Sequence, residues 1–96
     1  MIQIMARITA RPGNESELLA VLQDLVLPSR EEAGCVSYEL FQNEDEPSEF
    51  VTVEQWRDHL AADNHLATPH VQRAIALAAT LLAESPRIHR YRHIGR

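Results

Sequence analysis

The chain has 96 residues, 45% of them hydrophobic and 24% charged, which is the composition of one globular domain, expected here over residues 1–96. Its formal net charge of −5 argues against a nucleic-acid-binding protein, because phosphate binding needs a concentrated surface of Lys and Arg. Cys35 is the only cysteine, and the sequence has no signal-peptide pattern. It also has no apolar run near the roughly 20 residues that cross a bilayer. These features favour a cytoplasmic protein without a membrane segment.

The first third of the sequence predicts a strand followed by a helix. Apolar and polar residues alternate over residues 2–10, which is the period of a strand with one apolar face, and a Pro-Gly pair then ends it. Asn14 is the expected N-cap of the helix, with Glu17 completing a capping box. We expect Pro28 to kink or interrupt this helix and Gly34 to end the helical stretch. The helix has one apolar stripe, made of Leu18, Leu22, Leu25 and Val26.

The middle of the sequence predicts a hairpin and a short helix. Residues 35–42 and 49–56 are typical of strands, and the second of them is rich in β-branched and aromatic side chains. A short acidic turn joins the two, so we expect them to pair antiparallel. Asp58 is the expected cap of a short helix over residues 59–64.

The last third predicts a second long helix and a final strand. Thr68 and Pro69 form an N-cap and first-turn pair, which opens a helix through about Ala83. Residues 87–94 follow as the last strand. The order β-α-β-β-α-β is that of an α+β fold of the ferredoxin-like type.

Two helices can cover only one face of such a four-stranded sheet, so the other face needs a partner. In the first strand the alternate residues from Ile2 to Ile8 are expected to face the helices. In the third strand we expect Val51 and Val53 to face the helices, which places on the far face Phe50, Thr52, Glu54 and Trp56. Because this far face is too apolar for water, we expect a homodimer in which two sheets pack together.

Four stretches of the sequence resemble those of a known family. They are Arg11-Pro-Gly-Asn-Glu, Ser29-Arg-Glu-Glu-Ala-Gly-Cys-Val-Ser-Tyr38, Phe50-x-x-x-Glu54-x-Trp56 and His65-Leu-Ala-Thr-Pro-His70. Together they resemble the antibiotic biosynthesis monooxygenase domain family, which includes quinol monooxygenases and a branch that processes phosphorylated autoinducer-2. The resemblance covers essentially the whole chain. It implies a dimeric α/β barrel with a cavity between sheet and helices, and often oxygenation without metal, flavin or haem.

His65 and Glu54 are the candidate catalytic residues. An imidazole near its ordinary pKa can take a phenolic proton at neutral pH, and Glu54 could orient that imidazole. Each residue also has a purely structural interpretation. His65 could bond to the backbone at a helix junction, and Glu54 could hold the dimer together through an ion pair.

Four further side chains are candidates for substrate binding. Trp56 offers a flat aromatic wall, although simple core or dimer packing explains it as well. Tyr38 and Arg7 could donate to a substrate oxygen or an anionic intermediate, and a buried tyrosine or a salt bridge across the dimer are their alternatives. His70 lies in the first turn of the predicted helix, where a surface role is the alternative to binding.

The histidine spacing does not predict a metal site, because His59, His65 and His70 lack the spacing of helical ligand pairs. Together with the clustering of these side chains, the family resemblance implies the leading hypothesis, a monooxygenase without a cofactor that oxidises a small quinol or polyphenol with O2. The first alternative is an isomerase or lyase that moves a proton next to the carbonyl of a small, phosphorylated or unphosphorylated substrate. The second is a non-catalytic domain that binds small molecules in a stress response.

Overall fold

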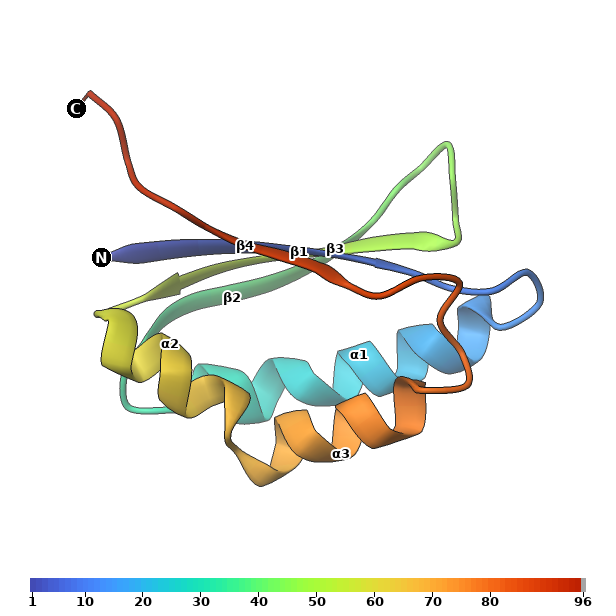
Figure 1. Cartoon of the computed structure of the whole chain (residues 1–96), viewed down its shortest axis with the longest axis horizontal. Helices are drawn as coiled ribbons and strands as arrows, with labels where there is room; N and C mark the ends of the chain where they lie inside the picture. Colours follow the sequence, from blue (N-terminus) through green and yellow to red (C-terminus); the bar gives the residue numbers. More distant parts are fainter. Residues whose placement is uncertain (96) are drawn as a thin grey trace.

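The fold consists of two layers, a four-stranded sheet with all of its helices on one face (Figure 1). The computed structural model describes residues 1–95. The elements are β1 (Ile2–Thr9), α1 (Glu15–Arg30), β2 (Cys35–Gln42), β3 (Glu49–Trp56), α2 (His59–Leu66), α3 (Pro69–Ala78) and β4 (Arg87–Tyr91). The predicted ferredoxin-like arrangement is confirmed, with the short helix α2 between β3 and the second long helix.

The sheet order is β2-β3-β1-β4, and every neighbouring pair is antiparallel. In the β1–β3 register Glu54 lies opposite Ile4, and in the β2–β3 register it lies opposite Tyr38. Directly opposed residues point to the same face of a sheet. Tyr38, Glu54 and Ile4 therefore all face the helices.

This register corrects the predicted orientation of the third strand. The structure places Val51 and Val53 on the open face and turns four other residues toward the helices, namely Phe50, Thr52, Glu54 and Trp56. Both faces of this strand carry bulky side chains, so alternation alone did not distinguish them. Phe50 and Trp56 are completely buried, and burying two aromatic side chains removes more apolar surface from water than burying two valines.

Helix α1 differs from its prediction at both ends. The side chain of Asn14 caps no backbone N–H, and its Nδ2 instead donates to Glu17 Oε1 at 3.2 Å. Pro28 does not interrupt the helix, which continues to Arg30. Pro28 cannot donate to the Asp24 carbonyl, and only two helical residues follow it. The helix buries the leucines of the predicted stripe, Leu18, Leu22 and Leu25.

The predicted caps of α2 and α3 are both present. Asp58 accepts a hydrogen bond from the backbone N–H of Ala61 at 2.8 Å, and α2 extends two residues beyond its predicted end at residue 64. Thr68 caps α3, but α3 ends at Ala78 rather than near Ala83. The chain leaves the helix there because the backbone N–H of Ala83 donates to Thr9 at the end of β1. The last strand is also shorter than predicted and ends at Tyr91.

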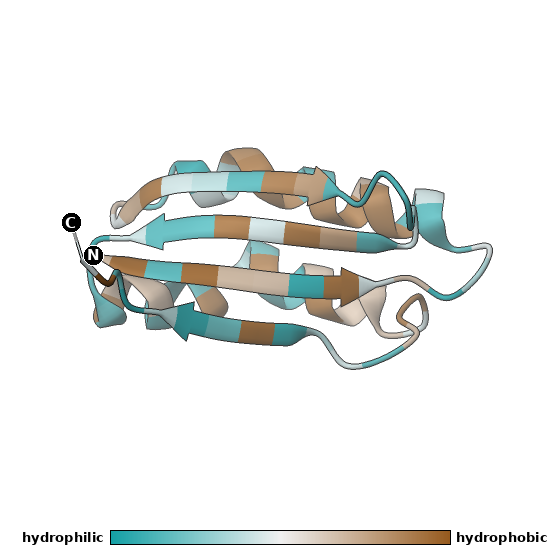
Figure 2. Ribbon diagram, turned by 90° about the horizontal axis from the view of Figure 1, so that it is seen from above, coloured by the Kyte–Doolittle hydropathy of each residue, from teal (hydrophilic) through white to brown (hydrophobic). Residues whose placement is uncertain are grey.

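The other face of the sheet carries no helix among residues 1–95 (Figure 2). It presents a mixture of apolar and polar side chains, and the apolar ones are Met5, Phe41, Val51, Val53 and Tyr91. None of the helices in the described chain has both the length and the apolar character needed to cross a membrane.

Candidate active site

A cavity of about 410 Å³ lies between the sheet and the helices. Most of its lining is apolar and comes from β1, α1, α3 and β4. Five of its lining residues are exposed, and they are Leu66, Ile75, Ala79, Pro86 and Ile88. Leu66 ends α2, Ile75 and Ala79 belong to α3 and its C-cap, and Pro86 and Ile88 lie at the start of β4. The cavity therefore opens between α3 and the β4 edge of the sheet. Four polar side chains line the cavity, and they are Tyr38, Thr52, Glu54 and His65.

Glu54 provides a buried carboxylate in this polar part of the cavity. The residue is 5% exposed, and both of its carboxylate oxygens accept hydrogen bonds from its own strand. Trp56 Nε1 donates to Oε1 at 2.9 Å, and Thr52 Oγ1 donates to Oε2 at 2.6 Å. These two donors satisfy the buried carboxylate and fix its position beside the cavity.

His65 lies in the last turn of α2 and is 4% exposed. Its ring packs on the indole of Trp56, with 4.4 Å between the ring centroids. Its Nδ1 lies 2.7 Å from Glu32 Oε2, and its Nε2 lies 3.9 Å from Glu54 Oε1. Because an ionised carboxylate can only accept, Nδ1 carries the proton of the Glu32 contact. In the neutral ring this leaves Nε2 with a free lone pair, which is the arrangement of a general base.

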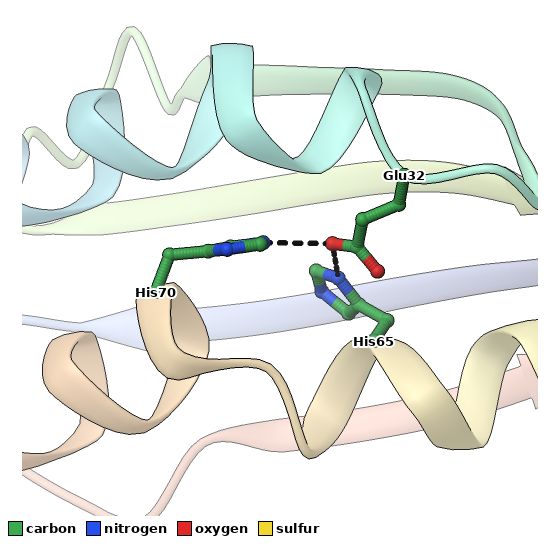
Figure 3. A group of neighbouring side chains, drawn as sticks. All are labelled: Glu32, His65 and His70. Atoms are coloured by element: carbon green, nitrogen blue, oxygen red, sulfur yellow. Dashed lines mark hydrogen bonds and ion pairs between the residues drawn. The ribbon is translucent and has the colours of Figure 1, made fainter.

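Glu32 joins two histidines from two helices (Figure 3). It follows the end of α1, and the same Oε2 that contacts His65 lies 2.8 Å from His70 Nε2. Thr68 fixes the chain between the two histidines, since its Oγ1 donates to the His65 carbonyl at 2.7 Å and accepts from the Val71 N–H. Three separate elements therefore meet at one carboxylate oxygen.

Tyr38 contributes a buried hydroxyl to the cavity, from β2. Burial raises the pKa of this hydroxyl well above its ordinary value of 10.0, and the nearby Glu54 carboxylate raises the pKa further. The phenol is therefore neutral at physiological pH and available as a hydrogen-bond donor. Its ring lies 5.7 Å from the His65 ring, measured between centroids.

The structure brings together four of the six residues singled out in the sequence, namely His65, Glu54, Trp56 and Tyr38. Trp56 contacts His65 and Glu54 but does not itself line the cavity. His70 is joined to the cluster through Glu32 and also lies outside the cavity lining. Arg7 is on the open face of the sheet, where it pairs with Glu49 at 3.2 Å, so it is separated from this site.

Two residues of the site, Glu32 and Thr52, were not recognised in the sequence. Glu32 lies in an acidic stretch at a helix end, which is typical of a solvated surface, and its two partners are 33 and 38 residues away. Thr52 was recognised only as a strand residue. The strand period already placed Thr52 on the same face as Glu54, and a correct assignment of that face would have placed both beside the helices. Glu32 lies in one of the four resembling stretches, but nothing in that stretch singled it out.

Comparison with known proteins places the chain in a family. The profile of the family described as antibiotic biosynthesis monooxygenase matches residues 1–77. The Bacillus subtilis protein named "Putative monooxygenase YcnE" is 37% identical over 83 residues, which are 86% of this chain and 87% of that protein. The uncharacterized protein sll1783 of Synechocystis is 33% identical over 91 residues, 95% of this chain, and the chain spans 62% of its length.

Solved structures agree with this assignment. The crystal structure of PA3566 from Pseudomonas aeruginosa matches with a TM-score of 0.92 at 36% identity, covering 98% of this chain and 94% of that one. The structure of Rv0793 from Mycobacterium tuberculosis matches with a TM-score of 0.92 at 30% identity, covering 99% and 96%. The profile match over most of the sequence, supported by these relatives, shows that the chain belongs to the antibiotic biosynthesis monooxygenase family.

Proposed function

We propose that the protein is a monooxygenase that oxidises a small, electron-rich phenol of the quinol type with O2 and needs no bound cofactor. The observation that carries this proposal is a buried imidazole, oriented by a carboxylate, beside a cavity that is otherwise apolar. Membership of a monooxygenase family supports the reaction class. An apolar cavity suits both an aromatic ring and dioxygen.

His65 is the proposed base. Its Nε2 takes the proton of the phenol, and Glu32 stabilises the imidazolium that forms, as the carboxylate does in other carboxylate–histidine pairs. The phenolate then passes one electron to O2, and the resulting radical pair combines to a peroxide on the ring carbon. His65 returns its proton to the peroxide. Loss of water, with the hydrogen of that ring carbon, gives the quinone, so that one O2 yields one quinone oxygen and one H2O.

The other polar groups have proposed supporting roles. The Tyr38 hydroxyl is a neutral donor that can bind the oxyanion of the phenolate. Glu54 lies 3.9 Å from His65 Nε2 and stabilises the protonated ring after proton transfer. Trp56 fixes the positions of His65 and Glu54, because its ring packs against the His65 ring and its Nε1 donates a hydrogen bond to Glu54. It positions the site rather than forming the wall of the cavity.

The lining of the cavity argues against a phosphorylated substrate. No Arg lines the cavity among the described residues, and the chain has no Lys. Phosphate recognition depends on such cations or on helix N-termini directed at the ligand. For the isomerase or lyase alternative, this argues against phosphorylated substrates and leaves the unphosphorylated ones. The phosphate group of a flavin or nicotinamide cofactor would likewise find no cationic side chain in the cavity.

We further propose that the protein is a homodimer, formed by packing the open faces of two sheets. The support is the apolar set on this face, in which Val51 and Val53 are already half-buried in one chain. The cavity is enclosed by one chain's own sheet and helices, so the proposed partner covers the opposite side of the sheet and supplies no wall to it.

The proposed reaction is tested by measuring oxygen uptake with a panel of quinols, under air and under argon. We expect quinone formation only with O2, with one O2 consumed per quinone. His65→Asn is expected to lower kcat by about 10²–10⁴-fold, as for loss of a general base, while the exposed control His93→Asn keeps the wild-type rate. Equal turnover under argon would exclude oxygenation and favour proton transfer alone. Binding of the aromatics without turnover would favour the non-catalytic alternative.

A further inference from the structure

The carboxylate shared by two imidazoles has the composition of a metal site. We propose that Glu32, His65 and His70 bind a divalent first-row transition metal ion such as Zn²⁺ or Co²⁺. The donor atoms are Glu32 Oε2, His65 Nδ1 and His70 Nε2, and all three lie within 4.8 Å of one another. The spacing of the histidines gave no such indication, because the third ligand comes from a helix end more than 30 residues earlier.

The donor set selects the class of metal. Two imidazole nitrogens and one carboxylate oxygen suit Zn²⁺, Co²⁺, Ni²⁺ or Fe²⁺, whereas Mg²⁺ and Ca²⁺ favour sites built from oxygen. Three protein ligands also leave a coordination position for water or another small ligand. We therefore expect binding of Zn²⁺ and Co²⁺ and no comparable binding of Mg²⁺.

The donor atoms are gathered at one point, and local side-chain movement would bring them to the spacing that such an ion needs. Ligand bonds of about 2.0–2.1 Å at a tetrahedral centre place the donor atoms about 3.3 Å apart. Glu32 Oε2 now lies 2.7 Å from His65 Nδ1 and 2.8 Å from His70 Nε2. The three donor atoms span up to 4.8 Å, so binding would withdraw the Glu32 carboxylate by about half an ångström and bring the two imidazole nitrogens closer together by side-chain rotation. The ion would then replace the two protons that these contacts share.

The surroundings support both binding and access. The second nitrogen of His65 points toward the buried Glu54 carboxylate, 3.9 Å away, and metal-bound histidines commonly direct their other N–H to a carboxylate. Two carboxylates beside the imidazoles also favour a divalent cation electrostatically. The side chains of His70 and Glu32 are 23% and 14% exposed, so an ion can enter from solvent without passing through the cavity.

Occupancy would remove the proposed base. A metal on Nδ1 leaves the proton of the neutral ring on Nε2, so His65 can no longer accept a proton from a substrate. The metal would therefore inhibit the oxygenation reversibly. This consequence rests on the proposed function, whereas metal binding itself does not.

Binding is tested by calorimetric titration of tag-free protein, first treated with EDTA, with ZnCl2, CoCl2 and MgCl2. We expect one Zn²⁺ per chain, and a cobalt complex with visible d–d absorption bands. Glu32→Gln and His70→Asn are each expected to weaken Zn²⁺ binding at least about tenfold, and His93→Asn is the matched control with unchanged affinity. Circular dichroism and thermal unfolding in EDTA establish that each variant is folded. The proposal would be overturned if the wild type did not bind Zn²⁺. It would also be overturned if folded Glu32→Gln and His70→Asn bound Zn²⁺ with the affinity of the wild type.

A second arm separates this inference from the proposed function. Oxygen uptake is measured with and without Zn²⁺, and the ratio of the two rates is compared between proteins. The wild type is expected to lose activity with Zn²⁺ and to regain it with EDTA, while the ratio for His70→Asn stays near one. Inhibition that is as strong in His70→Asn as in the wild type would overturn the regulatory part. Absence of activity even in EDTA would contradict the proposed oxygenation and leave the binding result standing.

Discussion

A single oxygen of Glu32 accepts hydrogen bonds from two imidazoles, and this makes its charge a testable feature of the site. Glu32→Gln keeps the size of the side chain but removes the negative charge that stabilises protonated His65. We expect kcat for quinol oxidation to fall about 10–100-fold, with a smaller change in KM because Glu32 does not line the cavity. Steady-state kinetics measures both quantities.

The control for this substitution is the neighbouring Glu31→Gln, because Glu31 is exposed and carries the same charge. It should leave kcat within about twofold of the wild-type value, as for an exposed charge screened by solvent. An equal loss of kcat in both variants would show that overall charge, rather than the Glu32–His65 contact, causes the effect.

Tyr38 makes the folding stability depend on pH at the alkaline end. Its pKa is raised in the folded protein, chiefly by burial, and the unfolded chain ionises near pH 10. Above that pH the unfolded state binds fewer protons than the folded state, so the free energy of unfolding decreases as the pH rises. Below it, the contribution of Tyr38 is fully present. The slope from this one group is at most about 1.4 kcal/mol per pH unit.

Urea unfolding between pH 8 and pH 11 measures this slope. Tyr38→Phe is the matched control, because it keeps the ring and removes the ionising hydroxyl. We expect the variant to lose stability with pH less steeply than the wild type. Identical slopes would contradict a raised pKa at this position.

At the scale of the elements, Gly34 allows α2 to lie close to the start of β2. A Cβ at this position would overlap with the Cβ of Ala61 on α2 and would also lie 3.4 Å from the Ala61 Cα. Gly34→Ala is therefore expected to destabilise the fold by about 1–3 kcal/mol, as for overpacking. It should also displace His65, which is on the same helix. Chemical denaturation and kcat measure the two effects.

The double variant Gly34→Ala/Ala61→Gly tests the cause of this loss. It removes the methyl group that the new Cβ would meet, so it should recover part of the stability. Recovery is incomplete because glycine within a helix costs about 1 kcal/mol relative to alanine. A double variant less stable than Gly34→Ala by the full cost of Ala61→Gly measured alone would show that the two positions do not interact.

Most of the fold could be predicted from local signals in the sequence. The bounds of β2 and β3 and the caps Asp58 and Thr68 follow from side-chain chemistry within a few residues. The orientation of β3 could not be predicted, because both of its faces are bulky and the choice depends on which residues the helices bury. The continuation of α1 past Pro28 could not be predicted either, because the loss of one hydrogen bond is weighed against the packing of the whole helix on the sheet.

The site was predictable in part for the same physical reasons. Trp56 and Glu54 are two apart on a strand, so that their proximity follows from the strand period. His65 could be placed near the short helix. The Glu32 contacts depend on how α1 packs beside α2 and α3, and such long-range contacts have no periodic signature in one sequence.

At the scale of the whole molecule, the proposed dimer depends on the open face of the sheet. Val53→Arg would place two like charges in the interface of a symmetric pair, where burying them costs several kcal/mol. We expect the wild type to sediment as a dimer at micromolar concentration and Val53→Arg as a folded monomer. Gln23→Arg adds the same charge at an exposed position of α1 and should remain dimeric. A wild-type monomer under these conditions would contradict the proposal.

The cavity combines residues from two different parts of the chain. The imidazole and its carboxylate partners all precede residue 78, inside the stretch that matches the family profile. Five lining residues come after it, at the entrance and along the β4 edge, and they are Ala78, Ala79, Leu82, Pro86 and Ile88. The rest of the lining, including the entrance residues Leu66 and Ile75, lies inside the matched stretch, so this last segment forms one part of the entrance. Exchanging the segment from 78 to 88 between relatives is expected to change which molecules enter, while the proposed base His65 keeps its carboxylate partners.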